Sequence, residues 1–148
     1  MTRRAVSYEV TAHSAAPPAR VFDLLADAPG WKRWAGPMVV RSWWEREGSP
    51  EPGGVGAIRR LGLGKLSSRE EIVEYDAPRH LAYTWLTKFP VRDYRADVRL
   101  EPDGTGTRIV WSGAFVPAFP GGATVMRRFF LGAVGGFTKR LAKEAERA

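Results

Sequence analysis

The residues best suited to contact a ligand are aromatic and apolar ones, at alternating positions of predicted strands and in the C-terminal segment. Residues two apart share one face of a strand, and the tyrosines and tryptophans among them add hydroxyl and indole donors. An apolar cavity with a few donors is the usual character of a small-molecule site. The predicted ligand-binding residues are Arg59, Tyr83, Trp85, Tyr94, Trp111, Phe115, Met126, Phe130 and Val134. The same rings could instead fill a solid core, and the pattern leaves both interpretations open.

Arg59 and Arg60 are neighbours on one predicted strand, so one of the two must point inward. An inward guanidinium could pair with a carboxylate or enolate of a ligand. Alternatively, it reaches the edge of the sheet or pairs with a glutamate such as Glu70 or Glu71. The sequence does not decide which arginine is the inward one.

Other kinds of chemistry find little support in the sequence. His13 is predicted on the wet face of the first strand and His80 in a turn; neither has a second ligand at metal spacing, so we expect no metal. No serine or threonine stands beside a histidine–carboxylate arrangement, which argues against a hydrolase triad. The glycines of "GLGK" (62–65) and "GTGT" (104–107) form hairpin turns and open no helix, so neither is a phosphate loop. We expect no cofactor, and the sequence identifies no catalytic residue.

Composition places the chain among single globular domains. Its 148 residues suffice for one domain with a core, and 44% hydrophobic with 26% charged residues argues against disorder. The absence of cysteine excludes disulfides, thiol nucleophiles and thiolate metal sites, and suits a reducing cytoplasm. No apolar run has the length of a signal or membrane segment, so we expect one domain over residues 1–148 in the cytoplasm, without membrane insertion.

The net charge of +7 could serve nucleic acid, anionic lipid or an acidic ligand. However, the chain contains no block of five or more basic residues, and its basic pairs lie far apart among 16 acidic residues. This distribution is typical of a solvated surface, so we expect no nucleic-acid partner.

The element that must cover any sheet is a long helix predicted over residues 120–148. Its apolar residues recur at three- and four-residue steps and therefore share one face. They are Met126, Phe130, Ala133, Val134, Phe137, Leu141 and Ala145. Gly132, Gly135 and Gly136 lie inside this helix, and each costs about 1 kcal/mol relative to alanine. We expect a strand to approach closely there, or else a cavity or a bend in the helix.

Upstream, the pattern predicts a strand over residues 4–14, two short helices and then six strands between residues 38 and 115. Pro17 and Pro18 suit the first turn of the first helix, and Trp31 and Trp34 present both indoles to one side of the second. Alternation with hairpin spacing predicts an antiparallel sheet with one covered and one wet face. The predicted fold class is α+β: a seven-stranded antiparallel sheet curled around a long C-terminal helix, with the two short helices between strands 1 and 2.

Four stretches support a family resemblance: "SAAPPARVFDLLADAPGWKRW", "EEIVEYDAPRHLAYTW", "FPVRDYRADVRLEPDGTGTRIVW" and the terminal helix. In this order they resemble the START-like (SRPBCC, helix-grip) superfamily, specifically its polyketide cyclase/dehydrase and lipid-transport branch. The resemblance covers almost the whole chain. It implies a deep pocket between the sheet and the long helix that binds an apolar or aromatic molecule.

We therefore interpret the protein first as a non-catalytic binder or carrier of a small apolar or aromatic molecule, a lipid or polyketide-like compound, because no acid/base pair of clear spacing points inward. The alternative is a polyketide cyclase, aromatase or dehydratase in which Tyr83, Tyr94 or an inward arginine assists proton transfer or stabilises an enolate. A further alternative is a protein-interaction module like the co-chaperone branch of the superfamily.

Two details of the predicted pocket remain expectations. The segment "FVPAFPGG" (115–122) is either a lid over the pocket mouth or an ordinary connection. Gly113 is expected to lie where a bulky substitution would fill the pocket. The oligomeric state is not predicted.

Overall fold

The chain folds into one curled sheet and a set of helices, in the order that the sequence predicts. The computed structural model describes residues 4–63 and 67–147. Within them the strands are β1 (Val6–Ser14), β2 (Arg41–Arg46), β3 (Ile58–Gly62), β4 (Ser68–Asp76), β5 (His80–Trp85), β6 (Val91–Asp103) and β7 (Gly106–Pro117). The helices are α1 (Pro18–Ala26), the 3-10 turn η1 (Ala28–Gly30), α2 (Trp31–Trp34) and α3 (Gly122–Ala145).

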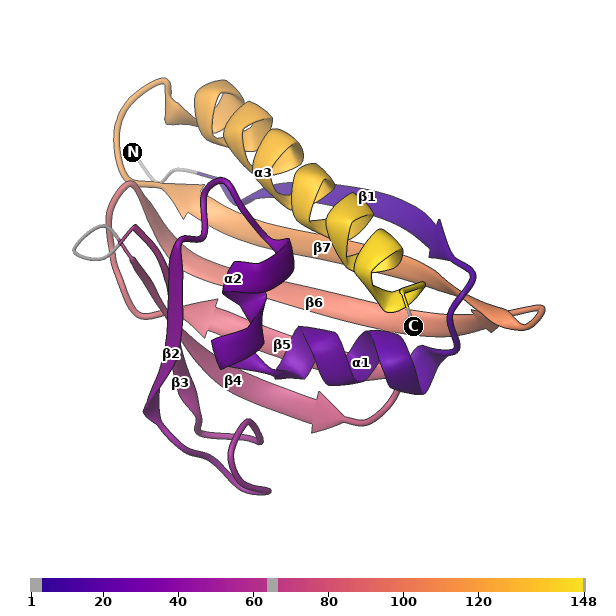
Figure 1. Ribbon diagram of the computed structural model, residues 1–148. Helices are drawn as coiled ribbons and strands as arrows, with labels where there is room; N and C mark the ends of the chain where they lie inside the picture. Colours follow the sequence, from indigo (N-terminus) through magenta and orange to yellow (C-terminus); the bar gives the residue numbers. More distant parts are fainter. Residues whose placement is uncertain (1–3, 64–66, 148) are drawn as a thin grey trace.

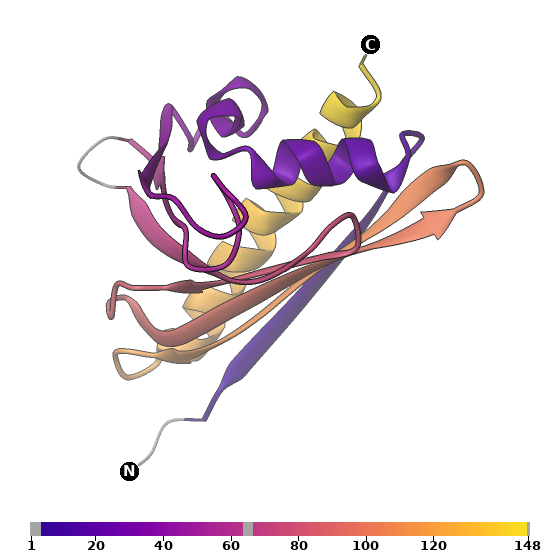
Figure 2. The same cartoon turned by 90° about the horizontal axis from the view of Figure 1, so that it is seen from below.

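The seven strands found in the described residues form one sheet in the order β1-β7-β6-β5-β4-β3-β2, and each paired neighbour is antiparallel. All helices lie on the same side of this sheet, with α3 running across β1 and β7 (Figures 1 and 2). The predicted α+β fold, with a curled antiparallel sheet and a long C-terminal helix, is therefore confirmed.

The sheet has one covered face and one wet face, as strand β6 illustrates. Its Tyr94, Ala96, Val98 and Leu100 are buried, whereas the intervening side chains are partly or fully exposed. Because strand residues alternate between faces, this pattern fixes the covered side as the one that packs against the helices.

Helix α3 buries the predicted apolar stripe against the sheet. Met126, Phe130, Val134, Leu141 and Ala145 are all buried. The helix spans Gly122–Ala145, so it begins two residues later than predicted.

The prediction that a strand approaches closely at the helix glycines is wrong. A Cβ atom on Gly132 would meet no atom within 4 Å, because this position faces open space. A Cβ atom on Gly135 would lie 4.0 Å from Val10 Cγ1, which is an ordinary contact. On Gly136 it would meet the flexible side chain of Arg140 of the same helix. No strand backbone therefore requires these three glycines.

The region between β1 and β2 follows the prediction, with one added turn. Pro18 occupies the first turn of α1, where a missing amide hydrogen costs nothing. The rings of Trp31 and Trp34 are 4.6 Å apart and both side chains are buried, as predicted for two indoles on one side. The turn η1 follows α1 after one residue, Asp27, and leads directly into α2.

The structure also shows where one predicted glycine turn and His80 lie. The turn between β6 and β7 falls in "GTGT" as predicted, whereas residues 64 and 65 of "GLGK" lie outside the described residues. His80 begins β5 and does not lie in a turn, so that prediction is wrong. Its register opposite β6 brings Nε2 within 2.7 Å of Asp97 Oδ2 on the wet face.

Candidate functional site

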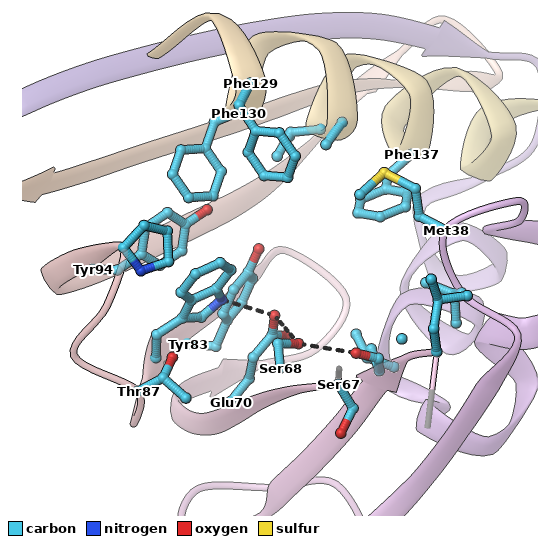
Figure 3. A pocket seen from close by; sticks show the side chains of 18 of the residues that line it. Met38, Ser67, Ser68, Glu70, Tyr83, Thr87, Tyr94, Phe129, Phe130 and Phe137 are labelled. Carbon is cyan, nitrogen blue, oxygen red and sulfur yellow. Dashed lines mark hydrogen bonds between the residues drawn. The ribbon is translucent and has the colours of Figure 1, made fainter. Parts of the chain in front are cut away.

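A cavity of about 480 Å³ lies between α3 and the covered face of the sheet (Figure 3). The helix contributes Phe129, Phe130, Ala133, Val134 and Phe137 to its wall. The rest of the wall comes from strands β3 to β6, the loops beside them and Trp31 of α2. The structure thus combines a filled core with a ligand-sized cavity.

Five of the nine predicted ligand-binding residues line this cavity: Tyr83, Trp85, Tyr94, Phe130 and Val134. Tyr83 and Trp85 are two apart on β5, so they share its covered face, and Tyr94 comes from the adjacent strand β6. The rings of Trp85 and Tyr94 lie 4.7 Å apart, and both contact Phe130 of the helix. The inward residues of β5 and β6 and the apolar stripe of α3 therefore contact each other here.

The other four predicted residues, Arg59, Trp111, Phe115 and Met126, are buried but do not line the cavity. Trp111 donates its indole N–H to the Tyr83 hydroxyl, with the two atoms 3.2 Å apart. The Phe115 ring packs 5.1 Å from that of Phe130. Trp111 and Phe115 support the cavity wall from behind, because they belong to β7, against which α3 packs directly.

Arg59 is the inward arginine, and its partner is a glutamate, one of the alternatives that the sequence left open. Its Nε donates to Glu70 Oε1 at 2.8 Å, and its Nη1 donates to the Leu25 carbonyl at 3.2 Å. The guanidinium lies between the rings of Trp31 and Tyr83, at 4.6 and 4.7 Å from their centroids. Its side chain is 0% exposed.

Arg60 points to the opposite face of β3. Its Nη1 donates to Glu45 Oε1 at 3.0 Å, on the wet side of the sheet. The alternation of neighbouring strand residues accounts for the different fates of the two arginines.

Glu70 is the polar centre of the cavity wall, and the sequence analysis did not place it in the site. Its Oε2 accepts hydrogen bonds from Trp85 Nε1 at 3.0 Å and from Ser68 Oγ at 3.1 Å (Figure 3). The strand register is what places Glu70 in the site, because it sets Glu70 opposite Arg59 on β3 and opposite Trp85 on β5. Without knowledge of that register, Glu70 and Glu71 were equivalent candidates.

Tyr8, which the sequence analysis did not single out, does not line the cavity but contacts two residues that do, Tyr94 and Phe130. Its hydroxyl is hydrogen-bonded to the Tyr94 hydroxyl, and its ring stacks on Phe130 at 5.6 Å. Tyr8 reaches this position across Gly113 of β7, where a Cβ atom would lie 2.5 Å from the Tyr8 ring. The expectation that a bulky residue at Gly113 would fill the pocket is therefore wrong, because it would first displace Tyr8.

Burial raises the pKa of the Tyr8, Tyr83 and Tyr94 hydroxyls well above the usual value of 10.0. The main cause is desolvation, which disfavours the phenolate; the Glu70 carboxylate raises the pKa of all three further, and nearby phenols raise that of Tyr8 and Tyr94. These hydroxyls therefore remain protonated near neutral pH. Tyr83 and Tyr94, which line the cavity, can donate hydrogen bonds to a ligand oxygen, but all three phenols are poorly suited to act as general bases.

Large exposed apolar side chains surround the mouth of the cavity. Met38, Leu63, Phe89 and Phe129 all line it and are 43%, 54%, 69% and 46% exposed. Of the segment predicted as lid or connection, residues 115–117 belong to β7 and none of residues 115–122 lines the cavity. The segment connects β7 to α3, with Phe119 packed 6.1 Å from Phe89.

Two further properties bear on the class of site. Residues 4–63 and 67–147 contain no cluster of three or more histidine, aspartate or glutamate side chains able to hold a metal ion. In the same residues, no helix combines the length and the hydropathy needed to cross a membrane.

The chain is similar to one protein family along nearly its whole length. The model of the family described as polyketide cyclase / dehydrase and lipid transport matches residues 5–146. Among curated proteins, an uncharacterized protein of Mycobacterium tuberculosis is 28% identical over 98 residues, which are 64% of this chain and 56% of that protein. The chain thus spans little more than half the length of this relative.

Solved structures with the same fold include proteins of different kinds. A START superfamily protein from Mycobacterium smegmatis has 12% identity and a TM-score of 0.79, covering 95% of this chain and 97% of its own. The Zhui aromatase/cyclase from Streptomyces sp. R1128 has 22% identity and a TM-score of 0.77, covering 97% and 95%. A protein from Thermobifida fusca has 27% identity and a TM-score of 0.73, covering 94% and 92%.

Proposed function

Since the chain belongs to the polyketide cyclase / dehydrase and lipid transport family, we propose that residues 1–148 act as one domain that binds or carries a small apolar or aromatic molecule, a lipid or polyketide-like compound. The observation on which this rests is the cavity beneath α3, whose wall consists mainly of aromatic and aliphatic side chains. Its volume of about 480 Å³ falls in the range of ordinary small-molecule sites, roughly 300–1,000 Å³.

The position of the aromatic rings favours a flat or ring-containing ligand. Trp85, Tyr94 and Phe130 form one contiguous group on the wall, with ring centroids between 4.7 and 5.4 Å apart. Aromatic rings at such distances attract a further ring through offset-stacked or edge-to-face contacts. The apolar mouth formed by Met38, Leu63, Phe89 and Phe129 gives such a ligand an entry path with little polar surface.

The basic charge supports no nucleic-acid role in this proposal. Arginines of the wet face of the sheet pair with acidic neighbours, as in Arg69 with Glu45 and Arg95 with Asp97. The carboxylates of these pairs offset the positive charge of their arginines, which makes this face less suited to bind a phosphate backbone. We place the protein in the cytoplasm, which the absence of cysteine supports.

A second candidate function, cyclisation or dehydration of a polyketide-like chain, is favoured by the Tyr83 and Tyr94 residues of the cavity wall. A protonated phenol can donate a hydrogen bond to a carbonyl that becomes an enolate, which lowers the barrier to carbon–carbon bond formation. The Zhui aromatase/cyclase shares the fold. Replacement Tyr94→Phe should reduce turnover of a polyketone at least about tenfold if this function holds, and unchanged turnover removes Tyr94 from that role.

The binding proposal is tested by native mass spectrometry of the protein purified gently from its own host. The expected result is a near-stoichiometric adduct that organic solvent releases, and the mass of the released compound distinguishes a lipid from a polyketide. An unmodified mass, together with no change of melting temperature across a panel of apolar metabolites, would refute the proposal. Detection of the same adduct on an unrelated protein from that host would reveal non-specific carry-over.

A further inference from the structure

The wall of the cavity contains one charged side chain among its described residues, the carboxylate of Glu70. Glu70 is buried, with 7% of its side chain exposed, and it lies across the cavity from the helix residues Phe130 and Phe137 (Figure 3). Its cationic partner Arg59 is 0% exposed and does not line the cavity. The face that the ion pair presents to a ligand is therefore its anionic half.

The donors around Glu70, which lines the cavity, leave part of its acceptor capacity unused. An ionised carboxylate accepts at about four lone-pair positions and donates none. Oε1 accepts from Arg59 Nε, and Oε2 accepts from Trp85 Nε1 and Ser68 Oγ. About one position remains for a donor from the ligand.

Two of the three Arg59 side-chain nitrogens donate to the protein, whereas the third, Nη2, is buried without a hydrogen-bond partner among the described residues. Nε donates to Glu70 and Nη1 to the carbonyl of Leu25 in α1. The rings of Trp31 and Tyr83 cover the two faces of the guanidinium. Because Arg59 is 0% exposed and does not line the cavity, none of the described lining residues presents a cation to a ligand, although the chain as a whole carries +7.

We propose that the ligand has an aromatic or apolar skeleton bearing a hydroxyl group, phenolic or alcoholic, that donates to the Glu70 carboxylate, and that ligands with a carboxylate are discriminated against. A hydrogen bond to a charged acceptor is among the stronger ones in a site sheltered from water. A ligand carboxylate would instead meet a like charge at low dielectric. This inference rests on the proposed binding function and narrows its ligand class.

The test compares three ligands that share one ring system: 2-naphthol, 2-methoxynaphthalene and 2-naphthoate. Isothermal titration calorimetry of each into the intact protein at neutral pH gives the three dissociation constants. We expect 2-naphthol to bind about tenfold or more tightly than 2-methoxynaphthalene, which lacks the donor, and 2-naphthoate to bind weakest.

Two matched variants assign this preference to Glu70. Replacement Glu70→Gln removes the negative charge, so the ratio of naphthoate to naphthol dissociation constants should fall about tenfold or more. Replacement Glu71→Gln makes the same chemical change one residue further along β4, on the wet face, where Glu71 pairs with Arg46 at 3.6 Å. The Glu71 variant should keep the wild-type ratio.

The outcomes separate the inference from the proposed function. Equal affinities for the three compounds, or tightest binding of 2-naphthoate, overturn the inference and leave the binding function intact. An unchanged ratio in a folded Glu70→Gln variant overturns the role of Glu70. If that variant does not fold, the three wild-type constants decide alone. Failure of all three probes and of larger apolar compounds to bind would contradict the binding function itself.

Discussion

Arg59 and Glu70 face each other across β3 and β4, with Nε and Oε1 2.8 Å apart and both side chains almost excluded from solvent. The pair joins the core to the cavity: Trp31 and Tyr83 enclose the guanidinium, while Trp85 and Ser68 donate to the carboxylate. In a buried pair of this kind, each charged group offsets part of the other's desolvation cost, so neither is tolerated alone.

Loss of one partner of this pair is expected to destabilise the fold strongly. Replacement Arg59→Met leaves the Glu70 carboxylate buried without its cation, so the free energy of unfolding should fall by about 3–5 kcal/mol. Urea denaturation followed by circular dichroism measures the change. The double replacement of Arg59 and Glu70 by methionine should recover most of this loss.

The matched control for this prediction is Arg69→Met, which breaks the ion pair with Glu45 on the wet face. Solvent already screens that pair, so its loss should matter far less. Equal losses in the Arg59 and Arg69 variants would show that the Arg59–Glu70 pair has no special structural weight.

Two glycine-to-alanine replacements should change stability in opposite directions. At Gly113 a Cβ atom would lie 2.5 Å from the Tyr8 ring, so alanine should displace Tyr8 and cost about 1–3 kcal/mol. At Gly132 a Cβ atom meets nothing within 4 Å, so alanine should stabilise α3 by about 0.5–1 kcal/mol. Thermal unfolding of the two variants beside the wild type measures both signs. A stabilised Gly113 variant would contradict the packing of Tyr8 across β7.

Stability should fall as the pH rises above about 10, because burial raises the pKa of Tyr8, Tyr83 and Tyr94 in the folded state. In the unfolded chain these phenols lose their protons near pH 10.0, whereas in the folded protein they keep them. Their contribution is therefore complete below pH 10 and declines above it, by about 1.4 kcal/mol per pH unit for each tyrosine.

Urea unfolding at a series of pH values between about 9 and 11 measures this decline. The Tyr94→Phe variant has one buried phenol fewer, so its free energy of unfolding should decline less steeply with pH than that of the wild type. Identical slopes in the two proteins would mean that Tyr94 ionises normally in the folded state.

The elements and the inward face of the sheet could be predicted because they depend on local periodicity. The alternation of Tyr94, Ala96, Val98 and Leu100 identified the covered side of β6, and the spacing of the apolar residues identified the buried stripe of α3. The START-like resemblance is confirmed by the family match over residues 5–146.

The limits of the cavity could not be predicted, because they depend on where α3 lies over the sheet. The helix packs on β1 and β7, so Trp111 and Phe115 of β7 are sealed into the core. Tyr83 and Trp85 of β5 lie farther from the helix and line the cavity. Alternation places all four residues on the same face and does not distinguish them.

Two polar contacts of the site required the strand register. The Tyr8 and Tyr94 hydroxyls meet across 86 residues of sequence, and only the pairing of β1 with β7 brings Tyr8 over Gly113. Glu70 differs from Glu71 only in the face on which it lies, and a shift of one residue exchanges the two faces.

The central claim, that the cavity beneath α3 binds a small aromatic molecule, is tested most directly by blocking it. Ala133 lines the cavity, whereas its neighbour Gly132 faces open space. Titration calorimetry with 2-naphthol should show saturable binding of one equivalent to the wild type and to the Gly132→Trp variant. The Ala133→Trp variant should bind at least about tenfold more weakly, since its indole occupies the cavity. Equal affinity in all three proteins would contradict the account, because the ligand would then bind elsewhere.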